Sequence, residues 1–156
     1  MGAIETKLQE LGLTLPQPAA PVANYVPFVR TGSLVVISGQ LCLGPEGKLS
    51  PAHTGKLGAE ISPEAGQEAA RLCALNLLAQ LKAAIGDLDK VVRCVRLGGF
   101  INAQPDFAAI APVMNGASDL MVAVLGERGR HARSTIGVAE LPLDASVEVE
   151  GMFEVR

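Results

Sequence analysis

The chain has 156 residues, of which 49% are hydrophobic and 19% charged, and this balance is typical of a folded domain rather than of a disordered chain. Its net charge of −3 argues against a protein that binds nucleic acid through a basic surface. No apolar stretch is long enough to cross a bilayer, so no membrane-spanning segment is expected.

The first part of the chain predicts a short helix, an extended connector and two strands. Residues 4–12 have the apolar spacing of an amphipathic helix, so segment 1–13 is expected to be a helical extension. The segment lacks the basic start and the apolar stretch of a signal peptide. Three prolines make residues 15–25 an extended connector. Residues 26–31 and 34–38 then predict two strands around a tight turn.

The middle of the chain predicts a loop followed by a long helix. Residues 43–62 are rich in Gly, Ser and Pro and are expected to form a surface loop. Ser62 has the right chemistry for a helix N-cap and Pro63 suits the first helical turn. The apolar periodicity continues to about Ile85, and Gly86 is expected to end the helix.

The second half predicts a strand, a helix and two further strands. Residues 90–101 read as a strand, and a helix is expected to open at Pro105 and to run to about Leu125, with a kink or break at Asn115–Gly116. Residues 133–141 and 146–156 predict two strands joined by a short turn. If these strands pair about the turn, Arg133 lies at the end of the first strand that is far from the turn, and Glu148 lies nearer the turn.

Side-chain alternation predicts which residues share a face of each strand. In the last strand, Val147, Val149, Gly151, Phe153 and Val155 alternate with Glu148, Glu150, Met152 and Glu154. In the strand at 90–101, the same rule places Val91, Val95 and Leu97 on one face and Val92, Cys94 and Arg96 on the other.

The predicted order is β-β-α-β-α-β-β, and no repeat or shift in composition divides residues 1–156. The economical interpretation is one α+β domain in which two main helices pack on one face of a mixed sheet. The three cysteines lack CxxC spacing, which favours reduced thiols that pack as small hydrophobic residues in a cytoplasmic protein.

Arg133 and Glu148 are the charged side chains for which two interpretations compete. A guanidinium at Arg133 offers a planar fork that suits a carboxylate, although Arg133 also fits a solvated charge in a basic loop. Glu148 fits a solvent-facing charge on a strand, or a group buried at a subunit interface where it would need a partner. Ser38-Gly39-Gln40 could bring backbone close to a ligand, or could form a simple bulge.

Other kinds of site have little support. His53 and His131 are the only histidines, and HxH, HExxH and CxxC patterns are absent, so no metal site is expected. Ser134 with His131 is a weak candidate for a nucleophilic pair because the two positions are almost adjacent. No phosphate-binding glycine motif occurs, so no nucleotide cofactor is expected.

Two blocks of the sequence resemble the Rid family, the YjgF-like reactive-intermediate deaminases. NYVPFVRTGSLVVISGQ is similar to the family's first block, and HARSTIGVAELPLDASVEVEGMFEV is similar to its signature, with Arg133, Leu141-Pro142 and Glu148 at matching spacing. The resemblance covers roughly residues 14–156 and is closest to a longer branch labelled endoribonuclease L-PSP or chorismate-mutase-like.

The resemblance implies a chorismate-mutase-like fold, a homotrimer with clefts between subunits, and cofactor-free hydrolysis of enamines and imines to 2-keto acids and ammonia. Carried over by position, Arg133 would bind the substrate carboxylate and Glu148 would position or activate water. Tyr25, Ser38 and Gly39 match positions that line the cleft.

Three departures from the family pattern concern substrate identity. Thr135 stands where the family often has Cys, Ala111 stands where it often has a cleft-lining Asn, and residues 112–130 are rebuilt. Thr135 and Asn115, which follows Ala111 by one helical turn, are placed with the substrate-binding residues. These departures leave open a non-catalytic trimeric module that binds small carboxylates or keto acids. A ribonuclease using Arg128–Arg133 has less support, because the chain is acidic and has no histidine pair.

Overall fold

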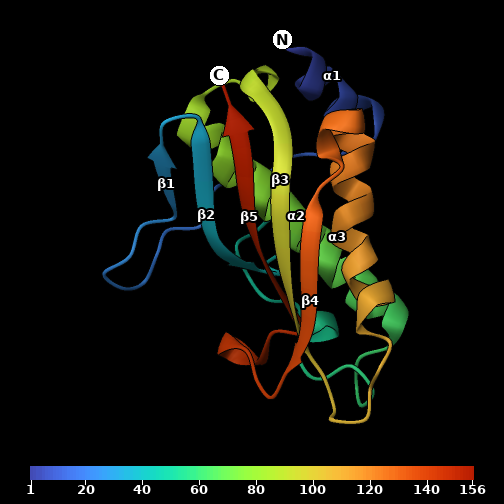
Figure 1. Ribbon diagram of the computed structural model, residues 1–156. Coiled ribbons are helices and arrows are strands. Elements are labelled where there is room, and N and C mark those ends of the chain that lie inside the picture. The colour runs from blue at the N-terminus through green and yellow to red at the C-terminus, as the bar shows by residue number, and fades with distance from the viewer.

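A computed structural model describes residues 1–156 and contains three helices and five strands (Figure 1). In chain order these elements are α1 (Ala3–Glu10), β1 (Phe28–Thr31), β2 (Leu34–Leu41), α2 (Pro63–Ile85), β3 (Val91–Asn102), α3 (Ile110–Leu125), β4 (Ala132–Val138) and β5 (Val147–Val155). None of the helices combines the length and the apolar character needed to cross a membrane.

The five strands form one mixed sheet with the order β1-β2-β5-β3-β4. β3 and β4 run parallel, and every other neighbouring pair is antiparallel. Both long helices lie behind the same face, so the opposite face carries no helix (Figure 1). The predicted α+β class, mixed sheet and order of main elements are therefore confirmed.

The expected pairing between the last two strands is wrong, because β3 lies between β4 and β5. The cause is the β3–α3–β4 crossover, which returns the chain parallel to β3 on the outer edge of the sheet. β5 must then enter between β2 and β3, where it pairs antiparallel with both. The short helical turn Pro142–Asp144 makes this connection and is not a hairpin turn.

α2 begins and ends where its capping residues predict. Ser62 Oγ accepts a hydrogen bond of 3.1 Å from the Ala65 amide, and Pro63 occupies the first turn, where its missing N–H costs nothing. Gly86 ends the helix with φ +80°, a conformation that glycine adopts without a steric penalty. The helix packs on β2 and β5 through its apolar side.

α3 differs from its prediction at both the start and the middle. Phe107 donates to the Gln104 carbonyl in a preceding turn, so the helix begins at Ile110 rather than at Pro105. No break occurs at Gly116, which instead lies against the Gln67 carbonyl of α2, where a Cβ atom would have no room. Gly116 thus permits close helix packing, and the expected kink is wrong.

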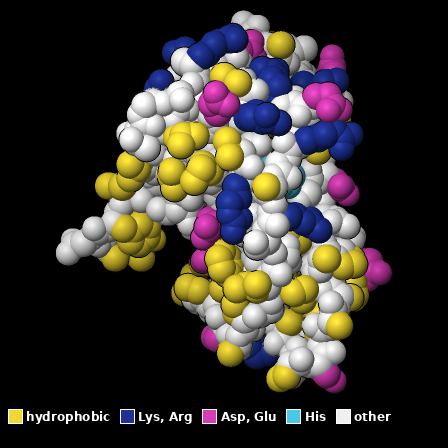
Figure 2. Space-filling model, viewed as in Figure 1, with side chains coloured by type: hydrophobic (Ala, Val, Ile, Leu, Met, Phe, Trp, Pro, Cys, Tyr) yellow, Lys and Arg dark blue, Asp and Glu magenta, His cyan; other side chains and the backbone are white.

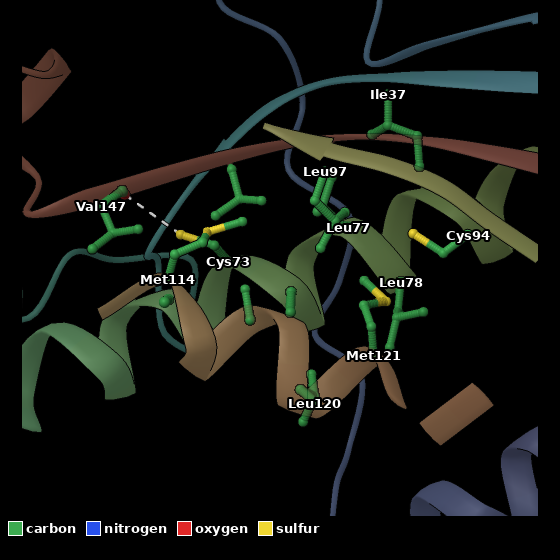
Figure 3. Close-up of a cluster of buried hydrophobic side chains, with 14 of the residues drawn as sticks. Ile37, Cys73, Leu77, Leu78, Cys94, Leu97, Met114, Leu120, Met121 and Val147 are labelled. Atoms are coloured by element: carbon green, nitrogen blue, oxygen red, sulfur yellow. Dashed lines mark hydrogen bonds between the residues drawn. The ribbon is translucent and has the colours of Figure 1, made fainter. Parts of the chain in front are cut away.

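The core lies between the two long helices and the sheet (Figure 3). The Cys73 thiol donates to the Val147 carbonyl at 3.4 Å, across the interface between α2 and β5. All three cysteines are free and buried, and burial raises the pKa of the Cys94 thiol to about 12. Burial thus supports the interpretation of the cysteines as small buried hydrophobic residues, while a hydrogen bond with Cys73 lowers the pKa of the Cys42 thiol to about 6.

Segment 43–62 is not simply a surface loop. It contains a short helical turn at Pro51–His53, and Leu57 and Ile61 are buried in the core. The Leu57 amide donates to the Asn102 carbonyl at 2.9 Å, so the segment is joined to the end of β3. The high Gly and Pro content of the segment indicated a surface loop, and the burial of Leu57 and Ile61 was therefore not predicted.

Candidate functional site

Arg133 and Glu148 lie on opposite faces of the sheet. Arg133 is aligned with Leu97 and Gly151 across β4, β3 and β5, and Leu97 is buried beneath the helices. Paired residues of neighbouring strands point to the same face, so Arg133 lies on the helix side. Glu148 is aligned with Phe100 and Ile136 in the row on the open face. The two side chains therefore do not meet within one chain.

Glu148 borders a hollow of about 500 Å³. The hollow lies between the connector that carries Tyr25 and the turn Pro142–Asp144, where the surface in Figure 2 is indented. Of the predicted site residues, Tyr25, Gly39 and Glu148 all line it. Its other lining residues are Ala19, Ala20, Pro21, Val22, Pro27, Gln40, Leu41, Leu43, Asn76, Pro142 and Leu143.

Gly39 makes room for the Glu148 carboxylate. A Cβ atom at Gly39 would lie 2.7 Å from Glu148 Oε2 and 2.9 Å from its Cδ. The β2–β5 register shifts between Ile37 and Gln40, so Gly39 belongs to a β-bulge as well as to the wall of the hollow. The bulge interpretation of this segment therefore holds, and the close approach at Gly39 is to the Glu148 side chain, so the approach of a ligand stays a prediction.

Ser38 supports the hollow without lining it. Its Oγ donates a 2.7 Å hydrogen bond to the Val26 carbonyl, and its amide donates to the Pro27 carbonyl at 2.9 Å. These bonds attach the chain segment that follows Tyr25 to β2. The structure thus places Ser38 as a residue that positions the Tyr25 wall.

The Glu148 carboxylate is half-buried and forms no hydrogen bond or ion pair with the rest of the chain. Burial, and then the neighbouring charge of Glu150, raise the pKa of Glu148 above its usual value. Raised proton affinity in a hollow is the property of a group that can take up and return a proton. The carboxylate is left free for a ligand or a water molecule.

Arg133 belongs to a hydrogen-bonded network with α3. Its guanidinium donates to Ser118 Oγ at 3.0 Å and to the Ala111 carbonyl at 3.4 Å. His131 Nδ1 lies 2.6 Å from the Gly129 carbonyl, which can only accept, so we assign the proton to Nδ1. His131 Nε2, 2.9 Å from Ser118 Oγ, then accepts from that hydroxyl. Ser118 thus bridges the other two side chains.

Thr135 and Asn115 lie on the Arg133 side. Thr135 follows Arg133 by two residues on β4 and so shares its face, and its Oγ1 is buried without a hydrogen-bond partner. Asn115 lies four residues after Ala111 and three before Ser118 on α3, and this spacing puts all three on one side of the helix. The predicted site residues therefore form two groups, one on each side of the sheet.

Sequence reasoning missed the polar residues that build these groups. Asn76 Nδ2 donates to the Leu41 and Leu43 carbonyls at 3.1 and 3.0 Å, and Gln80 Nε2 donates to the Ala19 carbonyl at 2.8 Å. Two amides spaced i, i+4 within the apolar stripe of a helix were the available signal. Ser118, within an apolar helix, gave no comparable signal.

The chain gathers no group of three or more His, Cys, Asp or Glu side chains that could hold a metal ion. The polar groups of the two sides instead offer a guanidinium fork, a free carboxylate and hydroxyl groups. Such a set can bind a carboxylate and move a proton.

Comparison with known proteins identifies the family of the chain. Residues 5–154 match a family model described as YjgF/chorismate mutase-like and as an endoribonuclease family. Protein TCP17 of Trypanosoma cruzi is 47% identical over 156 residues, which cover 99% of this chain and 96% of that protein. The 2-iminobutanoate/2-iminopropanoate deaminase of Salmonella typhimurium is 29% identical over 136 residues, or 86% of this chain and 89% of the deaminase.

A solved structure from Shewanella oneidensis that carries an endoribonuclease name matches the fold closely. It has a TM-score of 0.94 and 36% identity, and the match covers 99% of this chain and 100% of that one. The family model covers nearly the whole chain, and the fold and both sequence blocks agree with it. The chain belongs to the YjgF/chorismate mutase-like family.

Proposed function

We propose that this protein hydrolyses 2-imino acids, and their enamine tautomers, to 2-keto acids and ammonia in a cleft between subunits of a homotrimer. The observation that carries the proposal is the placement of Arg133 and Glu148 on opposite faces of one sheet. A cleft that needs both side chains must take one from each of two subunits. The name of the deaminase relative supports the chemistry.

The open face of the sheet supports an assembly. Val29 and Ile136 on this face are 52% and 50% exposed, and Figure 2 shows apolar side chains gathered over β1 and β2. Apolar patches of this kind mark surfaces that another protein covers. The outer edge of β4, which has no neighbouring strand, lies close to Arg133 and could approach the open face of a second copy.

The chemistry of the two groups matches the reaction. The guanidinium of Arg133 would hold the substrate carboxylate through two parallel hydrogen bonds. Glu148 would accept a proton from water as the water oxygen bonds to the carbon of the protonated imine, giving a neutral carbinolamine. Glu148 would then return this proton to nitrogen. As the C–N bond breaks and ammonia leaves, the carbinolamine hydroxyl would give its proton to Glu148 and the C=O bond of the keto acid would form. One imine and one water thus yield one keto acid and one ammonia.

A coupled assay tests the activity. A pyridoxal-phosphate dehydratase or an amino-acid oxidase would generate 2-imino acids, and keto-acid release would be followed with wild type, Arg133→Ala and Glu148→Ala. We expect wild type to accelerate release and both variants to lose at least about 100-fold in kcat/KM, the usual contribution of a positioned acid–base group. A folded wild type that accelerates no imine would contradict the proposal and favour a carboxylate-binding module.

Mixed assemblies test the shared cleft. Arg133→Ala and Glu148→Ala subunits, co-expressed with different tags, should regain activity at about a quarter of the sites, because random assembly joins an intact Arg133 to an intact Glu148 that often. Clefts built within single subunits would regain none. Light scattering that gave a monomer mass at micromolar concentration would also contradict the shared cleft.

A further inference from the structure

We infer that the hollow beside Glu148 binds an extended apolar side chain, so the preferred substrates are 2-imino acids with side chains of several carbons rather than the smallest ones. This inference rests on the proposed function and specifies its substrate class. A volume of about 500 Å³ falls in the range of small-molecule sites. The single methyl group of 2-iminopropanoate would fill little of it.

The walls of the hollow are mainly apolar. The connector contributes Ala19–Val22 and Tyr25, and the end of β2 and the residues after it contribute Leu41 and Leu43. Of the lining amides, Asn76 donates to two backbone carbonyls and Gln40 Nε2 donates to the Ser38 carbonyl at 2.9 Å. The polar groups without a partner are the Glu148 carboxylate and the Tyr25 hydroxyl, and the apolar part of the wall suits hydrocarbon.

Leu143 is a second and independent sign of an apolar ligand. It adopts φ +60°, in the left-handed region that is unfavourable for a residue with a side chain, and Leu143 is 71% exposed. Within the chain alone, no contact offsets the unfavourable conformation of Leu143 or the exposure of its side chain to water. Contact with an apolar group in the hollow would offset both costs.

A buried polar network holds Leu143 in this conformation. Asn102 is fully buried, and its Nδ2 lies 3.0 Å from Asp144 Oδ1, 2.9 Å from Glu140 Oε1 and 3.1 Å from the Ala145 carbonyl. Lys56 Nζ donates to Asn102 Oδ1 at 2.6 Å. Satisfied networks of this kind are rigid, so the turn presents Leu143 to the hollow in a fixed position.

Charge complementarity sets the orientation of the ligand. The N–H of an imine, or of its protonated form, suits the free Glu148 carboxylate, which has no other partner in the chain. With nitrogen at Glu148, the apolar side chain can extend along the wall towards Leu143 and Val22. The substrate carboxylate then remains for the Arg133 of another subunit.

The sole tyrosine provides a direct test. Tyr25 lines the hollow and the chain has no tryptophan, so intrinsic fluorescence reports on this place alone. We would titrate the assembled protein with pyruvate, 2-oxobutanoate, 2-oxopentanoate and 2-oxohexanoate, the stable keto acids of a graded series. Each added methylene should tighten the Kd about fourfold, the fold-change that corresponds to burial of one CH₂ group.

Leu143→Asn is the informative variant, since asparagine accepts the left-handed conformation and the turn should still fold. It should flatten the gradient of Kd with chain length. Leu11→Asn, a matched change at an exposed leucine remote from the hollow, should keep the gradient. A gradient that persists in Leu143→Asn, or is absent in wild type, would overturn the inference.

Two outcomes separate this inference from the proposed function. Ligand binding needs no turnover, so a steep gradient in a protein without deaminase activity would uphold the apolar hollow and reject the reaction. Deaminase turnover without a gradient of Kd with chain length would uphold the reaction and reject the apolar hollow. A shared cleft gives Tyr25 partial cover. Complete protection of Tyr25 from acrylamide in the ligand-free assembly would instead show that another subunit fills the hollow, and would also overturn the inference.

Discussion

The Arg133 side and the Glu148 side of the sheet differ in how their polar groups are satisfied. Arg133, Ser118 and His131 bond to one another and to two carbonyls, so the guanidinium is positioned before a ligand arrives. The Glu148 carboxylate has no such partner, and burial raises its pKa. In the proposed reaction, the Arg133 side is prearranged to bind the substrate carboxylate, and the Glu148 side retains a group that is free to react.

This difference has an energetic meaning. A half-buried carboxylate without hydrogen bonds destabilises the folded chain at neutral pH, while a satisfied network does not. Chains keep such an unfavourable group where function requires it. The comparison therefore predicts that changes around Glu148 should affect activity more than stability, and that changes around Arg133 should affect binding.

After loss of Arg133 or Glu148 itself, the largest effect is expected from Gly39→Ala. The new Cβ would lie 2.7 Å from Glu148 Oε2, and the flexible carboxylate can move away while the backbone stays. Because a displacement of about 1 Å can cost about 100-fold, we expect kcat/KM to fall by that order with the melting temperature nearly unchanged. Steady-state kinetics and thermal unfolding measure the two quantities.

Gly98→Ala is the matched control for this prediction. Its Cβ would lie 2.9 Å from Glu150 Cγ, on the same face of the sheet but beside the other glutamate. It should cost far less activity than Gly39→Ala. Equal losses in the two variants would indicate general crowding of the open face and would remove the special role of Glu148.

The secondary structure was largely predictable because it depends on local signals. Ser62, Pro63 and Gly86 mark the ends of α2, and the alternation in β5 assigns Glu148 correctly to the face opposite the core. The faces of β3 were less predictable. Bulges between Val91 and Arg93 and between Cys94 and Arg96 break the alternation, so Cys94 is buried together with Val91 and Leu97.

The arrangement of the site depended on information that no single segment contains. The resemblance named Arg133 and Glu148, but the side of the sheet on which Arg133 lies follows from the pairing of β4 with β3, where Arg133 is aligned with the buried Leu97. Local pairing rules favoured a hairpin, and the crossover through α3 prevented it. Ser118 became recognisable only once α3 lay against β4, because its partners are 13 and 15 residues away.

Ser118→Ala tests the prearranged side and should have an intermediate effect. The change removes the hydroxyl that accepts from Arg133 and donates to His131. Loss of a hydrogen bond to a charged group costs about 1.5–3 kcal/mol, so we expect KM to rise by about tenfold or more, with a smaller change in kcat. Ser134→Ala, on an exposed residue of β4 that faces the other way, is the control.

The variant Ser118→Thr sharpens the same test, because threonine keeps the hydroxyl group. Ser118→Thr should restore most of the affinity that Ser118→Ala loses. If Ser118→Ala lowered kcat and left KM unchanged, Arg133 would be acting in the chemical step rather than in binding of the carboxylate.

Glu150→Gln should shift the pH dependence of activity. The charge of Glu150 contributes, after burial, to the raised pKa of Glu148, so its removal should lower that pKa. If ionised Glu148 is the base, the acidic limb of the kcat/KM profile should move to lower pH. Glu154→Gln, farther along the same face of β5, should leave the limb in place. A limb that does not move in Glu150→Gln would assign it to another group.

The smallest effect is expected in the stability of Glu148→Gln. A pKa that is higher in the folded than in the unfolded chain contributes stability below the unfolded value, and this contribution is lost as the pH rises through the folded value. Glutamine keeps the shape without the charge. The variant should therefore be slightly more stable than wild type at neutral pH, with the difference vanishing below the ordinary pKa of a glutamate. Thermal unfolding across this range, with Glu46→Gln in an exposed loop as the control for net charge, measures it. A Glu148→Gln protein that is less stable at neutral pH would mean that the carboxylate has a stabilising partner in the assembled protein, and the contrast between the two sides of the sheet would then hold only for the isolated chain.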